Sequence, residues 1–174
     1  KVNIEYDPSL DGGVQQAGGN GGVSTGTNYN YAVTYSGIEG FDVMLGAGKT
    51  NYKAAGAADD TEQTGTVKYT MGALSAAYQM SSIQSGTAGT AGETVESYGV
   101  AFNVNDNLSI SMGVNDNTSD TPSGDNVTEE SSSLQAAYTM GSASFRMAMN
   151  SADNVGGTAG VSDDNLELSL KLSF

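Results

Sequence analysis

The feature that most constrains the fold is a strict two-residue alternation of apolar and polar side chains. It is clearest in the last nine residues, Leu166-Glu167-Leu168-Ser169-Leu170-Lys171-Leu172-Ser173-Phe174. On a helix, residues two apart lie about 200° apart, so these apolar groups would be spread over every face. On a strand they all point the same way. Asn165–Phe174 is therefore predicted to be a β-strand with one apolar face.

The same alternation recurs along the chain and predicts about ten strands. Eight further segments carry it: Tyr29–Tyr35, Phe41–Ala47, Val67–Met71, Leu74–Met80, Tyr98–Val104, Leu108–Val114, Leu134–Met140 and Ala143–Met149. Val2, Ile4 and Tyr6 predict one more strand at the start.

The connections between these segments alternate in length. The short ones, predicted to be hairpin turns, are Ser36–Gly40, Gly72–Ala73, Asn105–Asn107 and Gly141–Ser142. The long ones, predicted to be polar loops, are Asp7–Thr27, Thr50–Thr64, Ser82–Glu96, Asn115–Ser132 and Ser151–Asp164. An aromatic residue precedes each short turn, at Tyr35, Tyr69, Phe102 and Tyr138, with spacings of 34, 33 and 36 residues. The repeating unit is a strand, a tight turn, a strand and a long loop.

The composition excludes several kinds of function. The chain has 174 residues and a net charge of −14, and it contains neither cysteine nor histidine. Disulfides, zinc sites of the usual Cys/His type and nucleophilic triads that need a histidine are therefore excluded. Such an acidic chain repels nucleic acid, so a nucleic-acid partner is not expected. We also predict that the protein is not an enzyme.

Alternation is equally consistent with a soluble β-sandwich, so other features must distinguish the two. The apolar face continues through every predicted strand, and the opposite face carries small polar residues. Strand lengths match the roughly 9–11 residues of a tilted bilayer span. Short turns on one side and long loops on the other are typical of membrane barrels. We predict one all-β domain, residues 1–174, that is an antiparallel transmembrane β-barrel.

The terminal nine residues and two hairpins carry a resemblance to a known family. The hairpins read Y-T-M-G-A-L-S-A-A-Y and Y-T-M-G-S-A-S-F-R-M. Together these segments resemble the C-terminal portion of a general porin of the Gram-negative outer membrane. The resemblance implies a water-filled channel for passive diffusion of small hydrophilic solutes and ions, with no cofactor. It also implies a homotrimer, with outer-membrane lipid, lipopolysaccharide and the outer-membrane insertion machinery as partners.

The resemblance further implies an orientation and an aromatic girdle. The long loops would be extracellular and the C-terminus would lie on the periplasmic side. The girdle and insertion signal would comprise Tyr35, Tyr69, Phe102, Tyr138 and Phe174.

The strand count departs from that family, whose members have sixteen strands. We therefore expect a C-terminal portion of a larger barrel, and a complete ten-stranded barrel is the alternative. A secreted or surface-exposed β-protein, either an adhesin or a calcium-binding repeat protein, is the competing function.

The polar strand positions supply the candidate pore-lining residues: Asp42, Lys68, Gln79, Gln135, Arg146, Glu167 and Lys171. Arg146 and Lys171 lie on neighbouring predicted strands, so they form either an anion-attracting spot or a pair that Asp42 or Glu167 neutralises. Loosely bound calcium is a second candidate at the acidic segments, which are Asn115–Asn117 with Asp120 and Asp125, and Asp163–Asn165.

Overall fold

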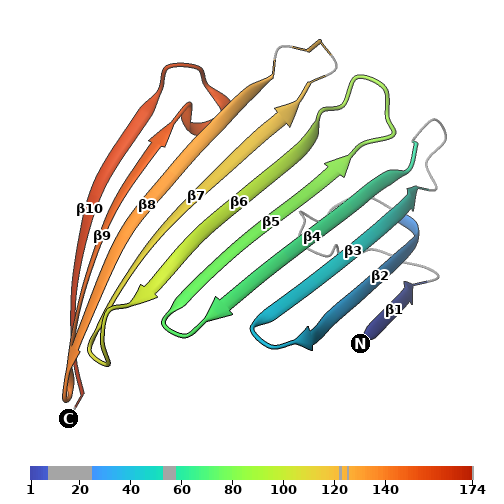
Figure 1. The fold of residues 1–174 in the computed structure, drawn as a ribbon. Helices are drawn as coiled ribbons and strands as arrows, with labels where there is room; N and C mark the ends of the chain where they lie inside the picture. Colours follow the sequence, from blue (N-terminus) through green and yellow to red (C-terminus); the bar gives the residue numbers. More distant parts are fainter. Residues whose placement is uncertain (8–24, 53–57, 122, 125, 174) are drawn as a thin grey trace.

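The computed structural model describes residues 1–7, 25–52, 58–121, 123–124 and 126–173, and they form one ten-stranded antiparallel sheet (Figure 1). Each strand pairs with the next one in sequence. The strands are β1 (Val2–Asp7), β2 (Thr25–Ile38), β3 (Phe41–Tyr52), β4 (Asp60–Met71), β5 (Leu74–Gln84), β6 (Gly92–Asn103), β7 (Leu108–Asp120), β8 (Val127–Met140), β9 (Ala143–Asp153) and β10 (Ser162–Leu172). A short 3₁₀ turn, η1 (Val155–Gly157), lies between β9 and β10. Among the described residues, no helix is long and apolar enough to cross a membrane.

The tight turns lie within the segments predicted for them, although β2 continues to Ile38 and leaves only Glu39 and Gly40 of the predicted turn Ser36–Gly40. Gly72 and Gly141 both adopt φ of +58°, which is open to glycine and strained for most other residues. Such positive φ values are typical of two-residue hairpin turns. Asn105 builds the turn between β6 and β7, because its Oδ1 accepts the backbone N–H groups of Asn107 and Leu108, both at 2.9 Å.

The long connections are shorter than predicted, because the strands extend into the polar segments. In the predicted loop Asn115–Ser132, β7 continues to Asp120 and β8 already begins at Val127. Polar cross-strand pairs support this extension, such as the hydroxyls of Thr118 and Thr128 at 2.7 Å. The backbone ladder needs no apolar side chains, so the end of the alternation does not mark the end of the strand. Most of the predicted loop Asp7–Thr27 lies outside the described residues.

The predicted alternation and the predicted strand at Val2–Tyr6 are confirmed, and the register brings the alternating apolar positions of successive strands to one face. Leu166 lies opposite Met149, which lies opposite Leu134, which in turn lies opposite Met112. We call this side the apolar face. It carries alternate residues of Val2–Ile4, Tyr29–Tyr35, Phe41–Ala47, Val67–Met71, Leu74–Met80, Tyr98–Phe102, Leu108–Val114, Leu134–Met140, Ala143–Met149 and Leu166–Leu172. The residues between them define the polar face.

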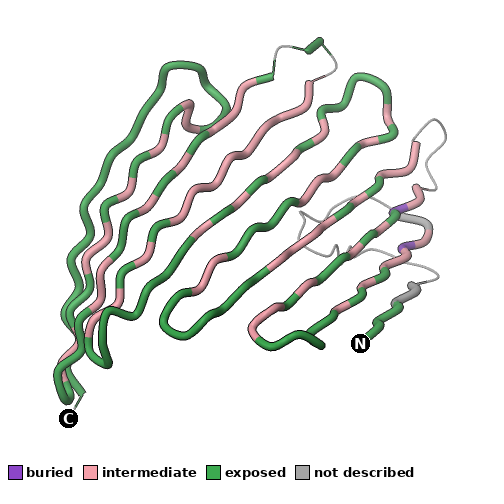
Figure 2. The backbone as a smooth tube through the Cα atoms, viewed as in Figure 1, coloured by how far each residue is buried: buried purple, intermediate pink, exposed green. Residues whose placement is uncertain are grey.

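The sheet is a single layer without a core of its own. No apolar side chain in the described part of the chain is buried; exposed and half-buried stretches alternate along most strands, and β10 is exposed throughout (Figure 2). The residues that are buried there are polar, Asn28 on β2 and Thr50 on β3, joined by a 3.0 Å hydrogen bond from Nδ2 to Oγ1. β1 and β10 form the two edges of the sheet and do not pair with each other, so these strands are not closed into a barrel.

Candidate functional site

The apolar face is the most unusual surface of the molecule. Leu45, Met112 and Leu168 come from strands far apart in the sheet, yet they are 58%, 51% and 62% exposed. Soluble monomers rarely expose contiguous apolar patches larger than a few hundred Å². A stable domain buries such a face against a second layer, and no described element lies over this one. The face therefore requires an apolar environment outside the described chain.

The apolar side chains form a band that runs obliquely across the strands. A register row, meaning residues directly opposite one another on successive strands, connects Val33 on β2 to Ser162 on β10. On β2 the band is centred beside Val33, which belongs to this row. On β10 it is centred between Leu168 and Leu170, which lie six and eight residues beyond the row residue Ser162. It thus shifts by about one residue per strand, and strand spacings of about 3.3 Å along and 4.8 Å across convert this shift to a tilt of roughly 30–35°. Closed membrane barrels have tilts of about 35–45°.

Four of the predicted girdle residues lie on the apolar face and are about half exposed: Tyr35 (51%), Tyr69 (45%), Phe102 (42%) and Tyr138 (43%). Tyr69 lies opposite Phe41, and Tyr138 lies opposite Phe145. Phe174 lies outside the described residues.

A second aromatic pair marks the other edge of the band on β5 and β6. Tyr78 lies opposite Tyr98, and the Tyr78 hydroxyl donates a 2.6 Å hydrogen bond to Oε1 of Glu96. Sequence reasoning overlooked this pair. The signal was the position of Tyr78 near the loop-proximal end of an alternating segment.

Beyond that edge, one register row carries four carboxylates on the same side of the sheet. Glu96, Asp116, Glu130 and Asp153 lie directly opposite one another on β6 to β9. Like charges in such positions repel, so the row weakens the sheet there and favours contact with water. The row ends the apolar band over these strands.

The polar face carries its cations near the tight turns, together with Asp42 and Glu167, and most of its other carboxylates near the long connections. All seven candidate pore-lining residues lie on it and are exposed. The cations Lys68, Arg146 and Lys171 lie toward the tight turns. The carboxylates Asp60, Glu62, Glu93, Glu129 and Asp163 lie toward the long connections.

The register also defines which of these charges are neighbours. Asp42 lies directly opposite Lys68. Arg146 lies opposite Ser169, so Lys171 is its diagonal neighbour, at a typical separation of roughly 7–8 Å. Among the described residues, the ion pair that forms is a different one, Lys49 with Asp59 at 2.9 Å. The hydrogen bond with Lys49 holds the pKa of the Asp59 carboxyl below its usual range.

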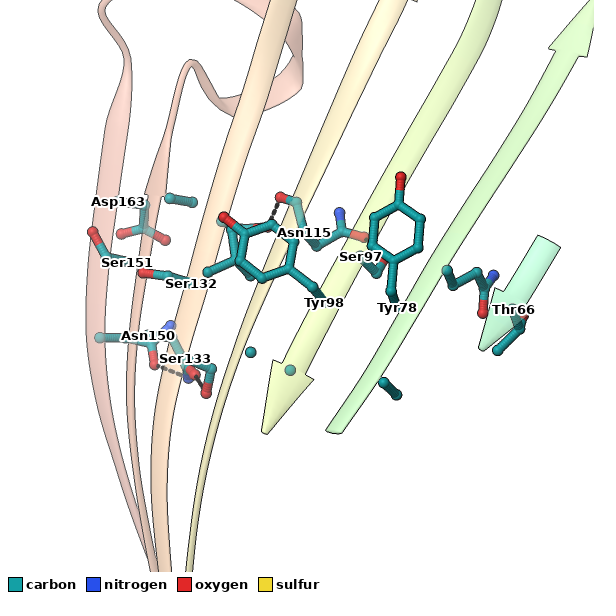
Figure 3. A pocket seen from close by; sticks show the side chains of 18 residues that line it. Thr66, Tyr78, Ser97, Tyr98, Asn115, Ser132, Ser133, Asn150, Ser151 and Asp163 are labelled. Carbon is teal, nitrogen blue, oxygen red and sulfur yellow. Dashed lines mark hydrogen bonds between the residues drawn. The ribbon is translucent and has the colours of Figure 1, made fainter. Parts of the chain in front are cut away.

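A hollow of about 590 Å³ lies on the polar face (Figure 3). Its polar-face lining belongs to two adjacent register rows that cross β4 to β10. Gly99 and Gly113 lie opposite each other in the middle of it. Short hydrogen bonds order its walls, from Ser97 Oγ to Asn115 Oδ1 and from Ser133 Oγ to Asn150 Oδ1, both 2.6 Å.

A tyrosine and two carboxyls lie together near the long connection between β3 and β4. The Tyr52 hydroxyl donates a 2.6 Å hydrogen bond to Oδ2 of Asp60. This bond, partial burial and the charges of Asp60 and Glu62 raise the pKa of Tyr52 to about 12. Desolvation, followed by the charge of Asp60, raises the pKa of Glu62.

The acidic segments proposed for calcium lie largely within β7 and β10. Asn115–Asp120 belongs to β7, where alternation places Asp116 and Asn117 on opposite faces. Asp125 lies outside the described residues. Within the described part of the chain, no group of three Asp or Glu side chains could hold a metal ion.

No known family model matches the chain, and no curated protein matches it significantly.

Proposed function

We propose that the chain forms the wall of a β-barrel in a bacterial outer membrane, and that the barrel is a water-filled channel for passive diffusion of small hydrophilic solutes and ions. The observation that carries this proposal is the uncovered apolar band, tilted against strands whose opposite face carries mostly small and polar residues. Lipid on one side and water on the other account for both faces at once.

The oblique path of the band favours lipid over a protein partner. On β8 the band runs from Leu134 to Met140, roughly 20 Å along the strand, and the tilt of roughly 30–35° reduces this length to a height of roughly 17 Å. The lipid-facing band of outer-membrane barrels is about 25 Å tall, so the band on β8 covers about two thirds of that height. A protein partner would have to follow the same oblique path over all ten strands, whereas lipid adapts to it without specific contacts.

A membrane location places one further requirement on the assembly. Unpaired backbone N–H and C=O groups in hydrocarbon cost several kcal/mol each, roughly, so β1 and β10 must both be paired in the inserted protein. We propose that the assembled protein is closed into a barrel in this way.

The remaining features of the proposal follow from the resemblance to general porins. The long connections are extracellular, the tight turns and Phe174 are periplasmic, and three copies associate. Outer-membrane lipid, lipopolysaccharide and the insertion machinery are the partners. The protein is a channel and not an enzyme.

The test compares adjacent residues of β10 in the full chain reconstituted into vesicles. Leu168→Arg puts a charge on the apolar face and is expected to lower the free energy of unfolding by about 2–4 kcal/mol. Ser169→Arg puts the same charge on the polar face and is expected to leave stability nearly unchanged while altering single-channel conductance. Equal losses in both variants, or a wild-type protein that is soluble and monodisperse without detergent, would overturn the proposal.

A further inference from the structure

The inference concerns the hollow on the polar face, and it rests on the proposed channel. We propose that the hollow is a binding subsite for neutral polyhydroxylated solutes of mono- or disaccharide size. Its volume of about 590 Å³ falls within the roughly 300–1,000 Å³ of small-molecule sites.

The hollow owes its depth to the pairing of small residues across strands. Ala77, Gly99 and Gly113 follow one another in a single register row on β5, β6 and β7. Longer side chains flank this row, including Asn115 and Gln79 in the adjacent one. A solute can therefore approach the backbone of the wall over three adjacent strands.

The rim of the hollow offers uncharged hydrogen-bonding groups of both kinds. Asn115 Oδ1 accepts from Ser97, and its Nδ2 has no partner among the described residues. Asn150 Nδ2 donates to Asn165 Oδ1 at 2.8 Å, which leaves Nδ2 of Asn165 without a partner in that part of the chain. These internal bonds hold the amides in place while free donors remain for a ligand.

The rim of the hollow also offers a hydrogen-bond acceptor beside these amide donors. Gln79 Nε2 donates to Ser81 Oγ at 3.3 Å, so its Oε1 is available for a ligand donor. A sugar hydroxyl both donates and accepts, so it can use the amide donors and this acceptor together.

The charge pattern disfavours ionic ligands. Asp163 is the one charged residue among the described lining residues, and neither lysine nor arginine lines the hollow. An anionic solute would meet this carboxylate without a compensating cation. A neutral solute loses no ionic hydration and can use the carboxylate as a further acceptor.

The experiment is single-channel recording of the full-length protein in planar bilayers, with trehalose as the neutral probe and gluconate as the charged one. Trehalose is expected to cause brief, concentration-dependent interruptions of the current. Gluconate at the same concentration is expected to cause fewer.

Two variants and one matched control locate the effect. Asn115→Leu is expected to weaken the apparent trehalose affinity about three- to tenfold, through loss of its hydrogen bonds. Gly113→Val fills the hollow, and a Cβ there meets only the Tyr98 carbonyl, at 3.8 Å, so the strand accommodates it. Asn117→Leu, on the same strand and face but outside the hollow, is expected to behave as wild type.

The outcomes separate this inference from the channel proposal. Current without trehalose-dependent interruptions, or equal losses in Asn115→Leu and Asn117→Leu, overturns the subsite and leaves the channel intact. Absence of current overturns the channel. Calorimetry with trehalose, in a detergent without a sugar headgroup, then decides the subsite: no binding heat, or equal binding to the Gly113→Val variant, overturns it as well.

Discussion

Two halves of one register row on the apolar face differ completely in chemistry. Over the first half, from β1 to β5, the row contains Val2, Val33, Leu45, Gly65 and Met80. Over the second half, from β6 to β9, it contains Glu96, Asp116, Glu130 and Asp153. The backbone hydrogen bonds are the same in both halves. The difference shows that the edge of the apolar band crosses the hydrogen-bonding direction at an angle, which agrees with the tilted strands of the proposed barrel.

The largest expected effect comes from placing a charge in the first half of the row. Leu45→Arg puts a guanidinium near the middle of the band on β3 and is expected to lower the free energy of unfolding in lipid vesicles by about 2–4 kcal/mol. Urea titration of the reconstituted protein measures it. Met44→Arg is the matched control, because Met44 faces the polar side, and a loss below about 1 kcal/mol is expected. Similar losses in both variants would contradict the assignment of the two faces.

A smaller gain of stability is expected in the second half of the row. Glu130 lies between Asp116 and Asp153, so Glu130→Gln removes repulsion on both sides and is expected to raise the free energy of unfolding by about 0.2–1 kcal/mol. The gain should shrink as added salt screens the charges. Glu129→Gln is the control, because Glu129 faces the other side and its Oε2 accepts the Gly156 N–H at 2.7 Å, so a small loss is expected. A salt-independent gain in both variants would refute the repulsion argument.

The sequence predicted whatever depends on a single strand. Alternation in Leu166–Leu172 identifies the strand and its apolar face, and the Y-T-M-G segments mark the turns at Gly72 and Gly141. The predicted loops failed where Thr and Asn pairs continue the ladder, because hydrogen bonding between backbones leaves no apolar pattern to read.

Features that depend on several strands were outside the reach of this reasoning. The carboxylate row and the Gly99–Gly113 hollow exist because particular residues lie opposite one another. A shift of one residue in register would place each partner on the other face. The register follows from turn geometry and packing along the whole hairpin, and the sequence pattern alone did not supply it.

The smallest expected effect concerns Glu62, on the polar face of β4, which lies opposite Gly48 and nearer the long connection than Gly65 of the row. Its pKa is raised by desolvation and by the charge of Asp60, so the folded state disfavours the carboxylate form. That penalty is present above the folded-state pKa and disappears as the pH falls through it toward the unfolded value of about 4.3. Glu62→Gln, neutral at every pH, should therefore raise the unfolding midpoint at pH 7 and lose this advantage below about pH 4. Urea midpoints of both proteins across this range measure the change, and a gain of equal size at both ends would show that packing rather than charge governs this site.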